Sequence, residues 1–304
     1  MTMQEPPPEK HAWRESLKAL GAKQGFYREL GAEHTALYLE GNSTLIVTFE
    51  NLDHVFDGDE SRMPWGHGFV TSQGWTMLGL LAHYWTWYRD EAGLDFFDGL
   101  RDEGFFKQFD RIVFYGASMG AYAAGVFSAA SPGATVIMIS PQATLDRRIA
   151  SWETRYRKVW RRSFQGRYAY APQAVQQAGK AHIFYDPRMG LDAMHAALFQ
   201  ADTVIKYPCR FMGHRIASLW IQMKLLKPVV QSCVDEQMTP LRFAQMMRAR
   251  KHTFRYQKDM LNRLLEMDRP WMTAQYCRAV LATRGGPNFR RALRAANARL
   301  SDNR

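Results

Sequence analysis

Residues 111–126 constrain the fold of this chain more than any other stretch, because they have the pattern of a strand, a sharp turn and a helix. Residues 112–115 are β-branched and aromatic, which is typical of a buried strand, and small apolar residues after the turn begin a helix. Gly116 and Gly120 flank Ser118 at equal spacing and leave room for the neighbouring strand and helix. The pattern favours a serine hydroxyl presented above a sheet; the alternative is a glycine-rich turn with an idle serine.

The motif Gly116-x-Ser118-x-Gly120 between a strand and a helix resembles the nucleophile elbow of the α/β-hydrolase superfamily, and the resemblance covers about residues 25–230. It implies a central, mostly parallel sheet, a serine triad, and ester, thioester or amide chemistry without a metal or organic cofactor. It does not imply a substrate, because this fold hosts many unrelated activities.

The composition is that of a globular protein, with 46% hydrophobic and 23% charged residues in a chain long enough to bury a sizeable core. No run of 18 apolar residues is present, so we expect no transmembrane helix. The polar, proline-rich N-terminus is unlike a signal peptide. Three widely spaced cysteines without a C-x-x-C motif favour a reducing compartment over a disulfide framework or a zinc site. We therefore expect a cytoplasmic protein.

Strand-like runs alternate with helical segments along most of the chain, which predicts an α/β fold with a mostly parallel central sheet and helices on both faces. The runs that define this sheet are residues 44–49, 112–115, 134–140, 181–185 and 203–207. An earlier run at 35–39 is separated from 44–49 by residues 40–43, and the Gly41-Asn42 pair within this segment predicts a hairpin turn.

We divide the chain into three parts. Residues 1–22 are expected to form a flexible leader and a short helix, and residues 23–235 the hydrolase-like domain, with a basic lid inserted at about 142–180. Residues 236–304 have apolar residues at helical spacing between many arginines, which predicts a basic, helical C-terminal appendage.

A serine nucleophile needs a base, and the base needs an orienting carboxylate. The order that the resemblance implies is serine, acid, histidine, with each on a loop after a strand. Asp186 directly follows the strand at 181–185, and His214 follows the strand at 203–207 in a Gly-His pair. We therefore assign Ser118, Asp186 and His214 as the triad.

Each of these assignments has a competitor. Asp192 lies close behind Asp186, but it is well placed to cap the following helix, so Asp186 is preferred. His214 could be an ordinary loop histidine, whereas His182 and His195 fall inside a strand and a helix and are less free to approach Ser118.

The oxyanion of an acyl-transfer intermediate needs hydrogen-bond donors. The resemblance implies the backbone amide of Met119 and a second donor in the loop after residues 44–49, where Asn51 could also donate through its side chain. The His-Gly or Gly-Gly pair that is common in lipases and esterases is missing from this loop.

Residues 147–167 hold eight basic residues and one acid, Glu153. Trp152, Tyr156, Val159 and Trp160 recur at helical spacing, which predicts an amphipathic lid with an aromatic underside and a cationic exterior. We expect Arg161, Arg162 and Trp160 to bind a substrate that combines an acyl or aromatic part with an anionic part. The alternative is a solvated basic surface.

The sequence thus favours a serine hydrolase, an esterase or thioesterase, acting on a small acyl substrate through an acyl-enzyme on Ser118. An acyltransferase would use the same triad. A non-catalytic scaffold of the same fold would bind an acidic partner, for example in polysaccharide assembly. Nucleic acid is not expected, since no recognised motif accompanies the arginines. The oligomeric state is not indicated by the sequence.

Overall fold

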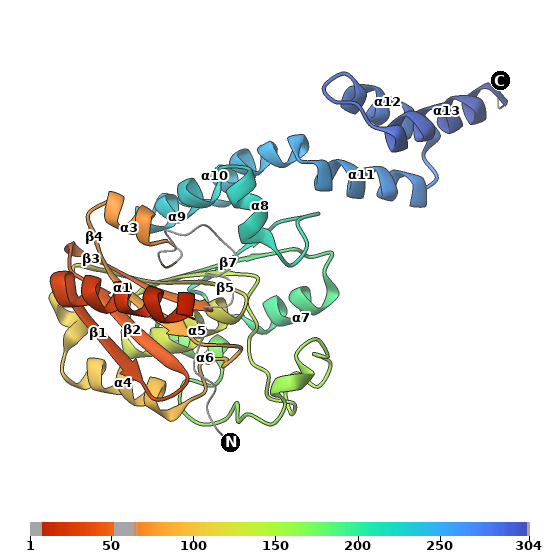
Figure 1. The fold of residues 1–304 in the computed structure, drawn as a ribbon. Helices are drawn as coiled ribbons and strands as arrows, with labels where there is room; N and C mark the ends of the chain where they lie inside the picture. Colours follow the sequence, from red (N-terminus) through yellow and green to blue (C-terminus); the bar gives the residue numbers. More distant parts are fainter. Residues whose placement is uncertain (1–7, 52–63, 65, 303–304) are drawn as a thin grey trace.

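The computed structural model describes residues 8–51, 64 and 66–302, with the side chains of residues 8–12 and 51 left out (Figure 1). Within this part of the chain, eight strands form one sheet in the order β1-β2-β4-β3-β5-β6-β7-β8. The strands are β1 (Gly25–Leu30), β2 (His34–Leu39), β3 (Asn42–Asn51), β4 (Trp75–Ala82), β5 (Arg111–Ala117), β6 (Thr135–Ile139), β7 (Lys180–Tyr185) and β8 (Val204–Pro208).

The pairing from β4 through β3 to β8 is parallel, and β2 runs antiparallel to both β1 and β4. The expectation of a mostly parallel sheet is confirmed. The helices of the sheet domain are α1 (Pro8–Gln24), α3 (His67–Ser72), α4 (Glu91–Asp102), α5 (Met119–Phe127), α6 (Ala171–Ala174), α7 (Gly190–Leu198), α8 (Ile216–Gln222) and α9 (Leu226–Val234). They are followed by α10 (Pro240–Met246), α11 (Phe254–Glu266), α12 (Pro270–Leu281) and α13 (Pro287–Asp302).

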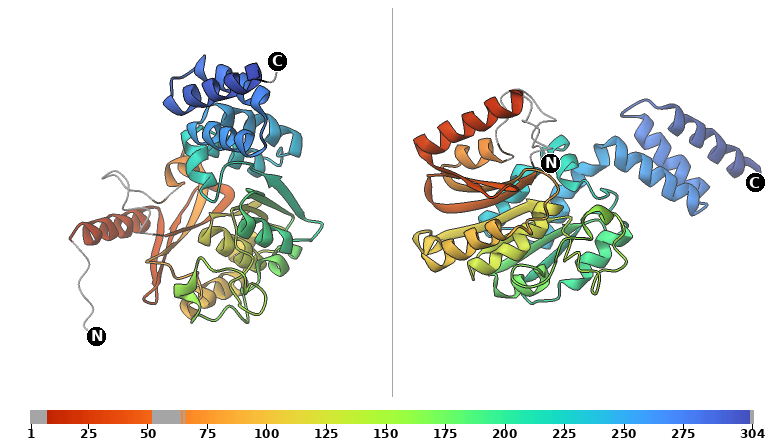
Figure 2. Two further views of the ribbon diagram at one scale, coloured as in Figure 1. Left: turned by 90° about the vertical axis from the view of Figure 1, so that its right-hand side faces the viewer. Right: turned by 60° about the horizontal axis from the view of Figure 1, so that its bottom comes forward.

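Each face of the sheet carries its own buried core, because side chains alternate along a strand. Along β3, Val47 and Phe49 join a cluster with residues of α4 and α5, whereas Ile46 joins a cluster with α1, α8 and α9. The two rotated views in Figure 2 show helices on both sides of the strands. The predicted three-layer arrangement is therefore present.

The predicted hairpin between residues 35–39 and 44–49 is wrong. The chain does reverse direction between them, but β2 and β3 do not pair, because β4 lies between them. All eight residues of β4 are buried, so this strand is stabilised by a place inside the sheet. Glycine fits position 41 of this connection because a side chain there would overlap the backbone of Trp75.

The predicted helical lid is also wrong. Residues 147–167 contain only a 3-10 turn, η3 (Arg157–Val159). Polar anchors replace helical hydrogen bonds. Arg89 donates to the carbonyl oxygens of Ser163, Gln165, Arg167 and Tyr168. These hydrogen bonds satisfy backbone carbonyl groups of residues 163–168 without a helix.

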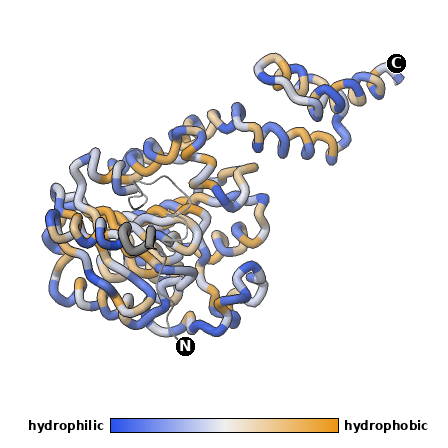
Figure 3. Tube along the Cα trace, viewed as in Figure 1, coloured by the Kyte–Doolittle hydropathy of each residue, from blue (hydrophilic) through white to orange (hydrophobic). Residues whose placement is uncertain are grey.

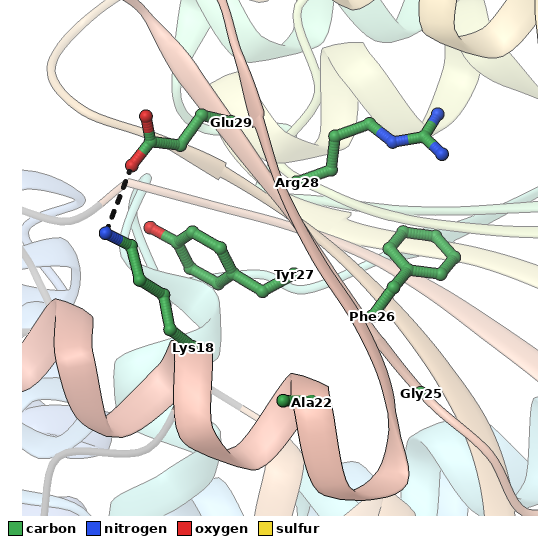
Figure 4. A pocket seen from close by; sticks show the side chains of 7 residues that line it. All are labelled: Lys18, Ala22, Gly25, Phe26, Tyr27, Arg28 and Glu29. Atoms are coloured by element: carbon green, nitrogen blue, oxygen red, sulfur yellow. Dashed lines mark ion pairs between the residues drawn. The ribbon is translucent and has the colours of Figure 1, made fainter.

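The last three helices have a separate small core, formed by Leu261, Cys277, Val280, Phe289 and Ala292. Figures 1 and 2 show α11, α12 and α13 projecting from the body that contains the sheet. At the opposite edge, a cavity of about 670 Å³ lies between α1 and β1 (Figure 4). Its polar lining is the ion pair of Lys18 and Glu29, 3.6 Å apart, with Tyr27 and Arg28, and it includes no residue assigned to the triad.

Candidate active site

Ser118 lies in a strained turn between β5 and α5. Its backbone has φ 53° and ψ −119°, an unfavourable conformation for a residue with a side chain. The two elbow glycines make the turn possible. A Cβ on Gly116 would overlap the carbonyl of Gly120, and a Cβ on Gly120 would overlap the carbonyl of Phe49 on β3. The spacing of the motif thus reflects close backbone approach on both sides of the serine.

The histidine predicted from the Gly-His pair reaches this serine. The Oγ of Ser118 lies 2.9 Å from Nε2 of His214, which is hydrogen-bonding distance. Ser140, which follows β6, donates from its hydroxyl to the carbonyl oxygen of His214 at 2.9 Å and fixes the backbone that carries the imidazole. The structure therefore brings together two residues that are 96 positions apart in the sequence.

The carboxylate on the other side of the imidazole belongs to Asp192, not Asp186. Nδ1 of His214 is 2.9 Å from Oδ2 and 3.1 Å from Oδ1 of Asp192. Asp186 instead accepts hydrogen bonds from the backbone amides of Arg188, at 3.0 Å, and Gly213, at 2.7 Å. The sequence-based choice of Asp186 as the partner of the histidine is corrected accordingly.

The sequence favours Asp186 because it predicts that Asp192 caps a helix, but α7 begins elsewhere. Its N-cap is Met189, and no side chain makes a capping hydrogen bond there. Asp192 lies in the first turn of α7 with its side chain fully buried and turned toward the histidine. Asp186 holds the Gly213 amide, so it shapes the loop that delivers His214 without touching the imidazole.

A second set of charges lies behind Asp192. Arg155, from the basic insertion, contacts Oδ1 of Asp192 at 2.6 Å and Glu153 at 2.6 Å. Glu153 in turn accepts from Nε2 of His195 at 3.0 Å, because Nδ1 of His195 accepts the backbone amide of Ala143 at 3.2 Å. A continuous polar chain thus runs from Ser118 to the start of the insertion.

The pKa values in this chain follow from burial and pairing. Burial alone would raise the pKa of Asp192, but hydrogen bonds from His214 and Arg155 outweigh it and hold the pKa below its ordinary value. For Glu153, burial likewise opposes the hydrogen bonds from His195 and Arg155, which prevail and lower the pKa to about 2. Burial lowers the pKa of His195, so this imidazole is neutral near pH 7.

Tyr156 brings a hydroxyl to the reacting side of the histidine. Its oxygen lies 3.4 Å from Nε2 of His214, the atom that faces Ser118. Gln142 contacts the same hydroxyl through Nε2 at 3.3 Å, and the ring packs edge-on against Trp87 at 4.7 Å between centroids. Burial is the main cause of a raised pKa for Tyr156, so the hydroxyl keeps its proton and remains a donor.

Of the two predicted oxyanion donors, the structure describes the backbone amide of Met119. Met119 is the first residue of α5, where a backbone amide has no partner within the helix. Among the described residues, no backbone acceptor faces it. Its thioether accepts the amide of Trp87 at 3.2 Å, which fixes the side chain. Asn51 is the last residue of β3, and its side chain, like residues 52–63, lies outside the described part of the chain.

Arg162, predicted to bind substrate, is already paired. Its guanidinium makes two contacts of 2.7 Å with Glu33, in the β1–β2 turn. Tyr84 donates to the same carboxylate at 2.6 Å. The structure therefore places Arg162 in an anchor between the insertion and the sheet and does not bring it into contact with the triad.

Trp160 lies between two arginines. The guanidinium of Arg147 is 4.3 Å from its ring centroid and that of Arg157 is 5.6 Å away. Neither arginine, nor the exposed Arg161, forms an ion pair with a described carboxylate. Arg157 directly follows Tyr156, so this cluster of cations is adjacent in the chain to a side chain that contacts His214.

The helix α11 supports the histidine loop. Phe211 packs edge-on against Tyr256 at 5.6 Å between centroids, and the guanidinium of Arg188 lies 4.7 Å from the Phe211 ring. Gly213 has φ 65°, and a Cβ there would overlap the guanidinium of Arg255. The first turn of α11 thus covers the loop next to His214.

Sequence reasoning missed the roles of Arg155, Glu153 and Tyr156 in this site. One signal was present, since Glu153 is the only acid among the basic residues 147–167 and a lone carboxylate there indicates a specific partner. In the described part of the chain, no group of His, Cys, Asp and Glu is arranged to hold a metal ion, and no helix is long and apolar enough to cross a membrane.

No protein-family model and no curated protein sequence matches this chain. Solved structures do. A capsule O-acetyltransferase of Neisseria meningitidis serogroup A is 16% identical, with a TM-score of 0.47 over 71% of this chain and 99% of the other. An esterase of Pyrococcus furiosus is 15% identical, with a TM-score of 0.44 over 69% and 92%. A hormone-sensitive lipase from a metagenome library is 14% identical, with a TM-score of 0.46 over 77% and 94%.

The chain's own features identify the fold. A strained serine turn follows a central parallel strand and opens a buried helix, with helices on both faces of the sheet. Serine, aspartate and histidine occur in that order along the chain and meet at the carboxyl ends of the strands. The protein has the α/β-hydrolase fold.

Proposed function

We propose that the protein is a serine acyl-transfer enzyme that hydrolyses a carboxylic ester or thioester through an acyl-enzyme on Ser118. The observation that carries the proposal is the continuous contact of Ser118 Oγ, His214 and Asp192, at 2.9 Å on each side of the imidazole. This arrangement supplies a nucleophile, a base and an orienting anion in the geometry that acyl transfer requires.

In this mechanism the Oγ of Ser118 attacks the substrate carbonyl while Nε2 of His214 takes the hydroxyl proton. Asp192 holds the Nδ1–H tautomer and stabilises the imidazolium. The Met119 amide donates to the oxyanion. Collapse breaks the bond to the leaving group, which receives the proton from Nε2, and water then repeats the sequence to release the acid. Tyr156 can donate to the leaving oxygen, because its hydroxyl lies beside Nε2.

Turnover of a neutral p-nitrophenyl ester by point variants tests this proposal. Ser118→Ala is expected to abolish turnover, and Asp192→Asn to lower kcat by about 10⁴-fold, the effect of removing the orienting anion from a triad. Asp186→Asn is the matched control, since it loses only a loop hydrogen bond and should retain most of the activity. Equal losses in the two aspartate variants, or unchanged turnover in Ser118→Ala, would contradict the assignment.

We further propose that the substrate carries an anionic group bound by Arg147 and Arg157 beside Trp160. Both guanidiniums are without an ionic partner among the described residues and lie against the same Trp160 ring, and Arg157 directly follows Tyr156 in the chain. Arg157→Ala should raise KM for an anionic ester by about tenfold and leave a neutral ester unaffected. Arg148→Ala is the control, because Arg148 is neutralised by Asp146 at 2.6 Å. Equal effects on both esters would exclude a specific anion site.

An acyltransferase would share the first half of this mechanism, with an alcohol or amine replacing water in the second. The two are distinguished by the product when an acceptor is added. A non-catalytic scaffold would give no turnover and no covalent intermediate at Ser118.

A further inference from the structure

The net charge of the chain is concentrated in its last helices. Residues 239–304 contain fifteen lysines and arginines and four acids, a net charge of +11, which equals the net charge of the whole protein. The remaining residues, including the arginine-rich insertion, are therefore electrically balanced. Such a concentration of charge attracts polyanionic surfaces.

The same unit exposes an unusual amount of apolar surface at one end. Four large apolar side chains within residues 265–272 are exposed, namely Leu265 (51%), Met267 (45%), Trp271 (63%) and Met272 (49%). They lie at the turn from α11 to α12. Figure 1 shows α11 running away from the sheet, so this turn, here called the apolar tip, lies at the end of α11 that is remote from the sheet. Figure 3 shows hydrophobic and hydrophilic residues interleaved along them.

The two acids of the apolar tip are each paired with an arginine. Glu266 pairs with Arg263 at 3.4 Å, and Asp268 pairs with Arg299 from the end of α13. Arg290, Arg291 and Arg294 are exposed in the first half of α13, nearer the α12–α13 turn than the tip, and form no ion pair with a described carboxylate. Their spacing places them on one side of the helix.

An apolar groove of about 620 Å³ continues from the tip between α11 and α12. Met260 and Leu264 of α11 and Met272 and Tyr276 of α12 line it, and Lys251 lies in its lining as well. Apolar side chains with lysines or arginines beside them are the combination that enters the interface of an anionic bilayer. A soluble polyanion would satisfy the arginines but leave the tip and groove in water.

We propose that the apolar tip and the basic helices behind it bind the surface of an anionic lipid bilayer, with Trp271, Met272, Leu265 and Met267 entering the interface. The arginines then lie among the lipid phosphates, where anionic headgroups attract them. This attachment does not depend on the triad, because the tip lies at the end of α11 remote from the sheet.

Vesicle sedimentation with the full chain tests the proposal. We expect binding to vesicles in which about a third of the lipid is phosphatidylglycerol, and at least about tenfold weaker binding to phosphatidylcholine alone. The double variant Trp271→Ala/Met272→Ala should weaken binding to the anionic vesicles by about tenfold or more, because its apolar contact is lost. Ile221→Ala, which truncates an exposed apolar residue of α8 in the sheet domain, is the matched control and should bind like the wild type.

All variants should retain the wild-type thermal transition, which shows that a loss of binding is not a loss of folding. The proposal is overturned if anionic vesicles do not bind the wild type at low salt. It is also overturned if the double variant binds as strongly as the wild type, since charge alone would then account for the interaction. Binding to soluble polyglutamate in place of vesicles would assign the surface to an acidic polypeptide and reject the lipid.

Discussion

Asp192 contacts His214 on one side and a fully ionised arginine on the other. The 2.6 Å contact from Arg155 withdraws part of the negative charge that would otherwise stabilise a proton on the imidazole. The arginine therefore orients the carboxylate and shares its charge with His214. Glu153 is buried and paired with the same guanidinium. Its negative charge offsets the positive charge of Arg155, which allows this arginine to be partly buried.

Replacement of Arg155 should be visible in the pH dependence of the reaction. In Arg155→Met the full charge of Asp192 acts on the imidazole that it contacts. Because the unprotonated imidazole is the base, the acidic limb of kcat/KM should then move to higher pH, by about one unit. Arg155→Lys keeps a positive charge and should shift the limb less. The prediction is contradicted if kcat falls in the methionine variant while the acidic limb of kcat/KM does not shift, because Arg155 would then only support the fold.

At the scale of the elements, the site depends on where strands end. The strands β5, β7 and β8 are parallel, so their carboxyl ends lie on the same side of the molecule. Ser118 follows β5, the loop of Asp186 follows β7, and His214 follows β8. The insertion is held against this side by Arg89 and by the pairs of Arg162 with Glu33 and Arg167 with Glu91. It therefore acts as an anchored wall that presents Arg155 and Tyr156, and not as the helical lid expected from its sequence.

The elbow glycines give a stability prediction with an internal control. Gly116→Ala should destabilise the protein by about 3 kcal/mol or more, because its methyl group would overlap the carbonyl of Gly120 and the turn would have to move. Gly99→Ala in α4 adds a methyl group with no atom within 4 Å and should stabilise the protein by about 0.5–1 kcal/mol. Urea denaturation of the two variants measures both. A neutral Gly116→Ala would show that the turn is not tightly constrained.

Several parts of this fold follow from local sequence, and the exceptions have physical causes. The strand, turn and helix around Ser118 were predictable because each residue's local preference agrees with its place in the fold. The pairing of β2 with β4 was not predictable, since a short connection between two strands does not determine whether a third strand lies between them. His214 was found from its position after β8. The contact of Asp192 with His214 was not predictable, because the direction of a side chain in the first turn of α7 depends on packing.

For the whole molecule, the chain combines a charge-balanced sheet domain with a strongly basic group of helices. The two are joined where Tyr256 packs on Phe211 and Arg255 covers Gly213, beside the histidine. The part of α11 nearest the sheet is thus in contact with the loop of the candidate site, whereas its far end carries the exposed apolar tip. The division of charge was visible in the sequence, but the contact between α11 and the histidine loop was not, because it depends on tertiary placement.

The most direct measurement is the site of covalent modification by a fluorophosphonate, determined by mass spectrometry of the intact protein and its peptides. The account predicts a single adduct on Ser118, lost in Ser118→Ala and slowed in His214→Ala, in which no base accepts the hydroxyl proton. An unmodified protein, or an adduct that persists in Ser118→Ala, would contradict it.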